Sequence, residues 1–146
     1  MYRHILISTD GSEVAQKGVD HGLSLAKALG ARVTLLTVSE RLPAYAALDG
    51  GLSQMVYDEY VASQKEAADK ILADAGAAAR RLGVAAEPVY VETALPAEAI
   101  LETAEARGCS LITMASHGRR GLGRLVLGSV TAEVLARSPV PVLVVR

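Results

Sequence analysis

The sequence predicts a doubly wound α/β domain, an open, Rossmann-like sheet of five parallel strands with helices on both faces. Three observations predict this fold. Five short runs rich in Val, Ile and Leu alternate along the chain with four helical patterns. Most of these runs are continuously apolar, which is typical of strands covered on both faces. Apolar residues make up 51% of the 146 residues but aromatic ones only 3%, so the core is expected to be aliphatic.

The first strand is predicted at residues 4–8, where a short apolar run ends in Thr9-Asp10-Gly11-Ser12. Gly permits the turn, and Ser12 is a good helix cap. The helix that follows stops at Gly30, a typical left-handed C-terminal residue. A second strand follows directly at residues 32–38. The expected buried stripe of this helix comprises Ala15, Val19, Gly22, Ala26 and Leu29.

The middle of the chain is predicted to contain an irregular connection and one long helix. The connection covers residues 39–52, and the helix runs from residue 53 to residue 82 with a charged opposite face. Tyr57 and Tyr60 either anchor this helix or pack over a ligand. A third strand is expected at residues 87–91. The apolar residues of the helix at helical spacing are Val56, Tyr60, Ala67, Ile71, Ala75, Ala78 and Leu82.

The last third of the chain is predicted to contain two helices and two strands. Pro96 suits the first turn of a helix that Gly108 ends, with Ile100, Leu101 and Ala104 on its buried side. The fourth strand covers residues 111–114, and the last helix begins near Ser129 and runs toward residue 136. The final strand, residues 142–145, follows Pro139-Val140-Pro141.

Composition excludes several classes of protein. Fifteen basic and sixteen acidic side chains give a formal net charge of −1, so the chain has no overall field that attracts nucleic acid or a membrane surface. One cysteine, Cys109, cannot form an internal disulfide and is expected to be buried. With no leader-like segment and no long apolar run, we expect one cytoplasmic domain over residues 1–146. His4, His21 and His117 lack metal-ligand spacing.

The connection between the fourth strand and the last helix carries the chemistry of an anion site. Between residues 115 and 129 lie three arginines, one histidine, four glycines and no carboxylate. Gly118 and Gly128 can adopt positive φ and bring backbone N–H groups close to a ligand. The helix start at Ser129 favours phosphate, and the hydroxyls of Ser129 and Thr131 add donors. Arg119, Arg120 and Arg124 either close over the anion or remain solvated.

A second unusual loop follows the first strand. Its carboxylate, Asp10, suits three roles: accepting a ribose hydroxyl, holding a hydrated divalent ion, or bracing the turn. Both loops leave the carboxyl ends of strands, where doubly wound sheets bind ligands at the point at which strand order reverses. The two loops are therefore expected to face one cleft. By analogy with other doubly wound sheets, the backbone of Val38 borders a base there.

The chain resembles the universal stress protein family over its whole length. The resemblance rests on Thr9-Asp10-Gly11-Ser12, on residues 116–122, on Leu127-Gly128-Ser129-Val130 and on the terminal residues 141–145. In nucleotide-binding members the phosphate loop reads Gly, two residues, Gly, nine residues, Gly, then Ser or Thr. This chain supplies Gly118, Gly128 and Ser129 but has Ala115 at the first position. Because Ala keeps the backbone donor, we expect weakened or unchanged binding.

The resemblance implies a fold of the adenine nucleotide α-hydrolase-like type and a nucleotide-binding regulator of stress adaptation. The implied ligand is ATP, or AMP or ADP, with Mg²⁺ held by Asp10 through the phosphates. It also implies a homodimer paired through residues 141–145, although a helix of the same monomer is the alternative cover for that edge. The implied site residues are Thr9, Asp10, Val38, Met114, Ala115, His117, Gly118, Arg119, Gly128, Ser129, Val130 and Thr131.

Two alternative functions remain open. A slow ATP hydrolase needs a group that positions water, and His117 or Arg119 are the candidates. However, no Ser-His-Asp or Cys-His spacing accompanies His117, so a general base is not predicted. A dimeric interaction module without nucleotide is the second alternative. No residue pattern identifies a protein partner.

Overall fold

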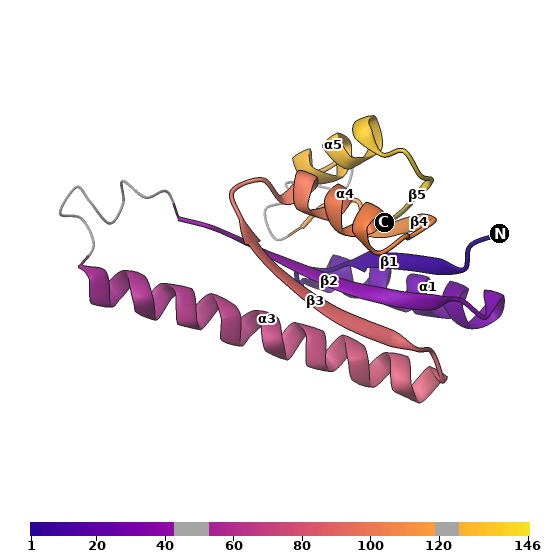
Figure 1. The fold of residues 1–146 in the computed structure, drawn as a ribbon, viewed down its shortest axis with the longest axis horizontal. Helices are drawn as coiled ribbons and strands as arrows, with labels where there is room; N and C mark the ends of the chain where they lie inside the picture. The colour runs from indigo at the N-terminus through magenta and orange to yellow at the C-terminus, as the bar shows by residue number, and fades with distance from the viewer. Residues whose placement is uncertain (43–52, 119–125) are drawn as a thin grey trace.

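The chain folds into an open sheet of five parallel strands in the order β3-β2-β1-β4-β5 (Figure 1). The computed structural model describes residues 1–42, 53–118 and 126–146. The doubly wound fold class predicted from the sequence is confirmed. In chain order the described elements are β1 (His4–Ser8), α1 (Glu13–Leu29), β2 (Arg32–Glu40), α3 (Gln54–Leu82), β3 (Ala86–Thr93), α4 (Pro96–Ala106), β4 (Leu111–Ala115), α5 (Ser129–Arg137) and β5 (Val142–Val145).

The ends of α1 and α3 follow the capping residues of the sequence. The hydroxyl of Ser12 accepts a hydrogen bond from the N–H of Ala15 at 3.2 Å, and α1 ends at Gly30 with φ of 64°. Ser53 caps α3 in the same way, and Gly83 ends it with φ of 71°. A hydroxyl cap satisfies one N–H donor of the first turn, and glycine adopts left-handed φ without steric cost. These boundaries are confirmed as predicted.

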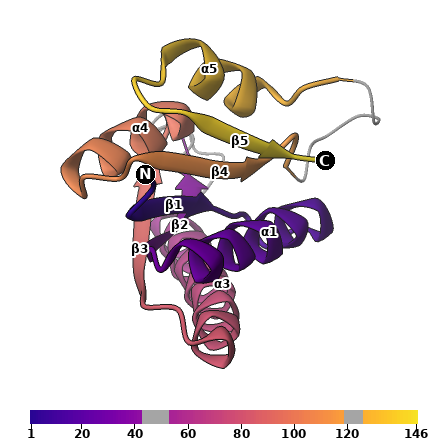
Figure 2. The same cartoon turned by 90° about the vertical axis from the view of Figure 1, so that its right-hand side faces the viewer.

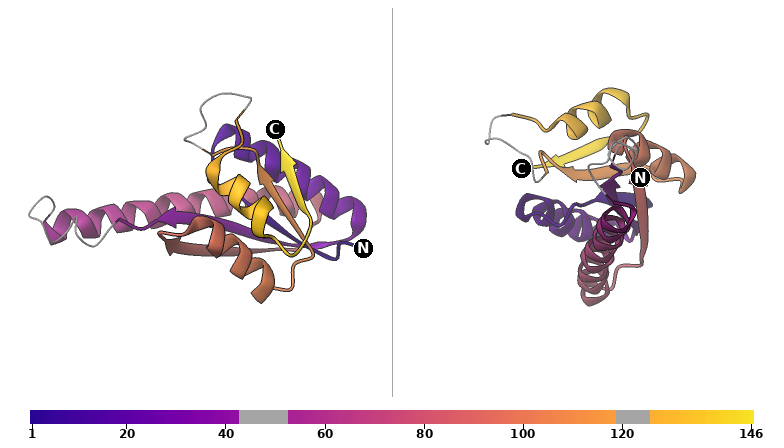
Figure 3. Two further views of the ribbon diagram at one scale, coloured as in Figure 1. Left: turned by 90° about the horizontal axis from the view of Figure 1, so that it is seen from above. Right: turned by 90° about the vertical axis from the view of Figure 1, so that its left-hand side faces the viewer.

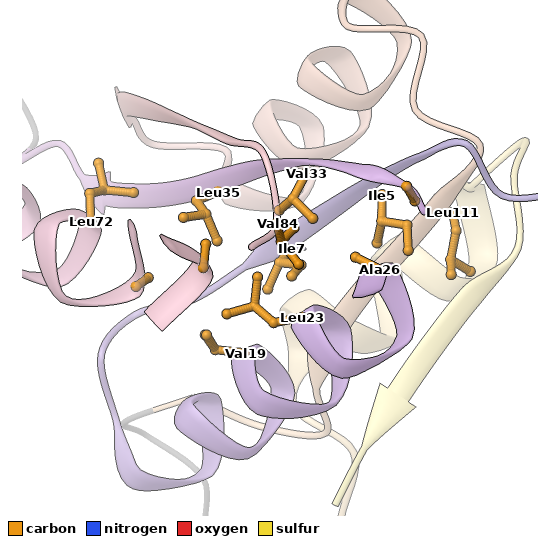
Figure 4. Packing of buried hydrophobic residues seen from close by; sticks show 13 residues of the cluster. Ile5, Ile7, Val19, Leu23, Ala26, Val33, Leu35, Leu72, Val84 and Leu111 are labelled. Atoms are coloured by element: carbon orange, nitrogen blue, oxygen red, sulfur yellow. The ribbon is translucent and has the colours of Figure 1, made fainter. Parts of the chain in front are cut away.

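Helices cover both faces of the sheet (Figure 2), with α1 and α3 on one side and α4 and α5 on the other. Successive strand residues point to opposite faces, so Ile5, Ile7 and Leu35 pack with α1 and α3, while Leu6 and Leu36 pack with α4 and α5. Figure 4 shows the first of these two clusters. The two cores explain why the strands are apolar at consecutive positions.

The predicted buried stripe of α3 is wrong in part. The buried residues of α3 are Ala68, Leu72, Ala75 and Ala79, and Val56 is 42% exposed. The 29-residue helix is about 43 Å long at 1.5 Å per residue, and it extends beyond the end of the sheet (Figure 3). Its first turns therefore have no sheet beneath them. Leu29 is likewise 47% exposed, because α1 ends there and Ala31 occupies the buried position instead.

Two glycines bring α1 very close to the sheet. A Cβ added at Gly22 would lie 2.6 Å from Cδ1 of Ile7 and 2.8 Å from its Cγ1. One turn earlier, a Cβ at Gly18 would lie 3.3 Å from the backbone nitrogen of Ala115, the last residue of β4. All three distances are shorter than ordinary contacts between non-bonded heavy atoms. The glycines of α1 therefore set how closely this helix approaches β1 and β4.

Candidate functional site

The two loops with unusual chemistry meet at one point of the sheet. β1 pairs with β2 on one side and with β4 on the other, so the direction in which strands are added reverses between β1 and β4. Ligands of doubly wound sheets bind outside the carboxyl ends of the strands at such a point. A cavity of about 430 Å³ opens there. This volume lies within the range of small-molecule sites, roughly 300–1,000 Å³.

The cavity collects every sequence-predicted site residue within the described part of the chain. Thr9 and Asp10 come from the end of β1, Val38 from β2, and Met114 and Ala115 from β4. Arg119, Arg120 and Arg124 lie outside the described residues. The remaining predicted residues that line the cavity are His117, Gly118, Gly128, Ser129, Val130 and Thr131.

The loop after β1 is built on hydrogen bonds to β2 and on its own side chains. The N–H of Thr9 donates to the carbonyl of Leu36 at 2.9 Å, and the hydroxyl of Thr37 donates to the carbonyl of Thr9 at 3.0 Å. Gly11 adopts φ of 77°. Oδ1 of Asp10 accepts a hydrogen bond from the N–H of Ser12 at 2.9 Å. One carboxylate oxygen of Asp10 thus braces the turn, as one of the three proposed roles requires.

Gly118 and Gly128 are needed for space and not for unusual φ. A Cβ at Gly118 would lie 2.6 Å from Oδ2 of Asp10, and a Cβ at Gly128 would lie 3.1 Å from Cα of His117. Neither is among the described glycines with positive φ, and Gly128 has φ of −59°. The expectation of positive φ is therefore wrong, because the loop turns at these points with ordinary backbone angles. The close neighbour is the side chain of Asp10 at Gly118 and the backbone of His117 at Gly128. The approach of a ligand to the backbone N–H groups at these glycines stays a prediction.

The start of α5 is an uncapped helix end that faces the cavity. Its N-cap residue, Gly128, has no side chain, and no described side chain caps the first turn. The N–H of Gly128 itself donates to the carbonyl of Ser116 at 2.7 Å. The first-turn N–H groups at Ser129 and Val130 carry a helix-end charge of about +0.5. This arrangement attracts an anion.

Thr131 has a different role from the donor role expected for it. Its hydroxyl donates to the carbonyl of Ala115 at 2.9 Å, and its side chain is buried. The bond ties the first turn of α5 to the last residue of β4. Thr131 therefore braces the two walls of the cavity against each other, and its hydroxyl hydrogen is already committed within the protein.

Apart from Tyr60, sequence reasoning missed the contribution of α3 and α4 to the cavity. Tyr60 and Gln64 of α3 line one side, and Pro96 and Ile100 of α4 line another. Their presence depends on how the helices dock, which no local pattern reports. Of the two roles open for Tyr60, lining the cavity is the position observed. Further missed wall residues are Ser8, Ala15, Thr37, Ser39, Glu40, Ala67, Ala68 and Ile71.

The described groups with perturbed pKa values lie at the amino end of the sheet, away from the cavity. Burial, followed by the charge of Arg32, lowers the pKa of His4, whose Nε2 lies 2.8 Å from Oγ1 of Thr34. A hydrogen bond from Arg107 lowers the pKa of Glu87. Burial raises the pKa of the Cys109 thiol, which is buried as expected. Their pKa shifts arise from burial and from neighbouring arginines, and not from the cavity.

Two further classes of feature are absent from the described ranges, a membrane-spanning helix and a cluster of metal-binding side chains. No helix there is long and apolar enough to cross a membrane. Nor do three or more His, Cys, Asp or Glu side chains come together as they would around a metal ion. Asp10 and Glu40 are the described carboxylates at the cavity wall, and a cation at Asp10 would need further ligands from the bound molecule.

Comparison with known proteins gives one consistent family. The family model described as "Universal stress protein family" matches residues 1–146. A universal stress protein of Thermus aquaticus is 34% identical over the full length of both chains, and YxiE of Bacillus subtilis is 36% identical over the full length of both. The solved structure of MJ0577 superposes with a TM-score of 0.79 at 30% identity, over 99% of this chain and 96% of that one. The chain belongs to the universal stress protein family.

Proposed function

We propose that this protein binds an adenine nucleotide, ATP with Mg²⁺ or the related AMP or ADP, and acts as a dimeric regulator in stress adaptation. The observation that carries the proposal is the uncapped start of α5 at the cavity. By comparison, α1 and α3 are both capped by serine hydroxyls. α4 also lacks a side-chain cap, but it begins with Pro96, which has no N–H to offer a ligand. A helix start whose N–H groups have no side-chain cap is suited to the phosphate of a ligand.

The walls of the cavity suit the other parts of a nucleotide. Val38, Ile100 and Met114 supply an apolar wall, and Oδ2 of Asp10 lies beside Gly118. Apolar walls with a few polar groups are typical of small-molecule sites. We assign the base to the apolar wall, the sugar hydroxyls to the region of Asp10, and the phosphates to Ser129 and Val130.

Ala115 is compatible with this assignment. It is the last residue of β4, is 7% exposed, and pairs in register with Val145. No described residue other than glycine has positive φ, so the methyl group of Ala115 sits on ordinary strand backbone. A position that needs no glycine conformation accepts alanine without strain. We therefore expect the protein to bind nucleotide with alanine at position 115.

Asp10 fits a supporting role toward Mg²⁺. Its Oδ1 accepts the Ser12 N–H, and Oδ2 lies beside Gly118 at the cavity. Mg²⁺ keeps several waters and is commonly bound by one or two carboxylates together with substrate phosphates. When bound, the ion would neutralise phosphate charge. Asp10 would hold it with the phosphates, and no further described carboxylate is assigned to it.

Solved relatives with this fold include nucleotide complexes. One universal stress protein was solved in complex with cAMP and superposes with a TM-score of 0.69 at 24% identity. Another, from Archaeoglobus fulgidus, was solved in complex with dAMP, at 21% identity and a TM-score of 0.64. At these identities the likeness concerns the fold. The proposal for this chain therefore rests on its own cavity and loop residues.

The proposed dimer pairs β5 of two copies. The sheet has two edge strands, β3 and β5. β3 contains Pro88, which lacks an N–H donor, and acidic residues that discourage pairing. β5 has only aliphatic residues over Val142–Val145, and Leu143 is 37% exposed. An apolar edge strand of this kind is suited to pairing across a two-fold axis.

Titration calorimetry with ATP and Mg²⁺ tests the proposal, supported by a thermal shift. At a ligand concentration of 100 times Kd, folding is expected to gain about 2.7 kcal/mol. Gly128→Val should abolish the heat, because the added side chain enters a space where even a Cβ lies 3.1 Å from Cα of His117. Gly76→Ala, on α3, is the matched control, since its Cβ meets only Nη1 of Arg80 at 3.6 Å. No heat and no shift at millimolar nucleotide would overturn the proposal.

Two further measurements separate the alternatives. A slow hydrolase would release ADP at a rate that falls in His117→Ala, whereas a binding protein would return ATP unchanged. A nucleotide-free interaction module would release no nucleotide when freshly purified protein is denatured and its small molecules are weighed by mass spectrometry.

A further inference from the structure

Ser116 lies behind the cavity wall and is tied to three parts of the fold. It is 7% exposed and does not line the cavity. Its N–H donates to the carbonyl of Val145 at 2.8 Å, and its carbonyl accepts from the N–H of Gly128 at 2.7 Å. Its Oγ lies 3.1 Å from Nδ1 of His117. Its backbone is held by β5 and by the start of α5, so the Cα of Ser116 has a defined position relative to that helix end.

His117 is the neighbouring residue that does line the cavity. Its backbone packs against the start of α5, as the 3.1 Å distance from its Cα to a Cβ at Gly128 shows. The imidazole thus lies beside the hydroxyl of Ser116, in a residue that lines the cavity and whose backbone contacts the helix start assigned to phosphate. A neutral imidazole has one N–H donor and one acceptor nitrogen. Which nitrogen carries the hydrogen is set by the bond that the other makes.

A serine hydroxyl can donate or accept, so its contact with Nδ1 fits either tautomer of the ring. We propose that Ser116 is a positioning residue that orients His117 and supports the tautomer suited to an anionic ligand. In this arrangement the Ser116 hydroxyl donates to Nδ1, so that the hydrogen of the neutral ring resides on Nε2. The Nε2–H group then donates to an anionic oxygen in the cavity. The reverse arrangement, with Nδ1–H donating to Oγ, would present the Nε2 lone pair to the anion and repel it. The ligand part of this inference rests on the proposed function.

The assignment of Ser116 differs from a catalytic role. A serine whose hydroxyl donates to a histidine resembles part of a nucleophilic pair, but Ser116 is absent from the cavity wall, so a substrate would not reach its Oγ. The residue acts through His117 and through the start of α5. Removing the hydroxyl leaves both backbone hydrogen bonds of Ser116 in place, so Ser116→Ala isolates the side-chain contact.

Nitrogen-15 NMR of histidine-labelled protein tests the positioning directly and without a nucleotide. The chain has three histidines, and His117→Gln identifies the signals of residue 117. For the neutral ring, we expect an acceptor signal from Nδ1 and an N–H signal from Nε2. Ser116→Ala should shift the Nδ1 signal toward that of an unbonded nitrogen, and Ser116→Thr should restore it. An N–H on Nδ1 in the wild type, or an unchanged spectrum in Ser116→Ala, would overturn the inference.

Binding measurements test the ligand part. Loss of one hydrogen bond is worth about a three- to tenfold change in affinity, so Ser116→Ala should weaken ATP with Mg²⁺ by that factor, leave adenosine unchanged, and be rescued by Ser116→Thr. Ser110→Ala is the matched control, because the Ser110 hydroxyl bonds to the carbonyl of His4 away from the cavity. Equal ATP affinity in wild type and Ser116→Ala overturns this inference alone. No ATP binding by the wild type overturns the proposed function and the ligand part with it, while the NMR result still decides the tautomer.

Discussion

Gly22→Ala is expected to destabilise the protein relative to the same substitution at Gly76. Both glycines lie inside helices, Gly22 in α1 and Gly76 in α3. At Gly22 the new Cβ would lie 2.6 and 2.8 Å from two side-chain carbons of Ile7, which is 0% exposed. At Gly76 the new Cβ would meet Nη1 of Arg80 at 3.6 Å, an ordinary contact. The pair therefore differs in packing and shares the change in helix propensity.

The magnitude follows from two opposing effects. Alanine is better than glycine in a helix interior by about 0.8–1.0 kcal/mol, and this gain applies to both variants. Forcing an extra carbon into a close-packed core costs about 1–3 kcal/mol, because Ile7 must leave its rotamer or the backbone must move. That cost applies to Gly22 alone. The difference in the free energy of unfolding between the two variants is thus expected to be about 1–3 kcal/mol.

Thermal and denaturant unfolding of both variants measure this difference. For a domain of this size, 1 kcal/mol shifts Tm by roughly 2–4 °C, so Gly76→Ala should melt clearly above Gly22→Ala. Shortening the partner gives a further check. Ile7→Val normally costs about 0.5–1.5 kcal/mol, and it should cost less in the Gly22→Ala background because the closest atom is removed. Equal melting temperatures of the two glycine variants would refute the close approach of α1 to β1.

Three further predictions concern charge, the loops and the edge strand. Burial lowers the pKa of His4 below 6.5, so the unfolded chain binds this proton before the folded chain does as pH falls. The free energy of unfolding should therefore decline as pH falls from about 6.5 to the lowered pKa. Urea titrations should show a smaller decline in His4→Gln. Gly118→Ala should weaken ATP binding in calorimetry, since its Cβ would lie 2.6 Å from Oδ2 of Asp10; in an Asp10→Ala background the same substitution should have little further effect, and fully additive losses would contradict this contact. Leu143→Lys should shift the protein toward monomer in sedimentation velocity, because Leu143 is 37% exposed on the edge strand; an unchanged dimer would place the interface elsewhere.

The predicted residues on the loops that leave β1 and β4 line one cavity, and their binding role stays a prediction. Glycines, a helix start and a carboxylate can be interpreted from the local sequence, because each determines the backbone or charge of its own segment. The same reasoning associated Gly118 and Gly128 with positive φ, which neither residue adopts. Glycine is equally needed where another segment passes close by, as Asp10 does at Gly118. Spacing along the chain does not distinguish these two needs.

Apart from Tyr60, the residues of α3 that line the cavity were not predicted from the sequence. Apolar residues of α3 recur at helical spacing on more than one face, and the residues that are buried, such as Ala68 and Leu72, lie one position away from the predicted stripe. Which face packs inward depends on the docking of a long helix over a twisted sheet. Consequently Tyr60 and Gln64 line the cavity although no pattern marked Gln64 at all.

The sequence by itself determined the elements of this protein, their order and their ends. Apolar runs, serine caps and terminal glycines act over a few residues. Their effect can therefore be predicted from the local sequence, as at Ser12 and Gly30. Only the tertiary structure decided the strand order β3-β2-β1-β4-β5. That order brings Asp10 beside Gly118 and Ser116 beside Val145. Contacts between residues so distant in the chain depend on the packing of whole helices against the sheet, which no local segment specifies.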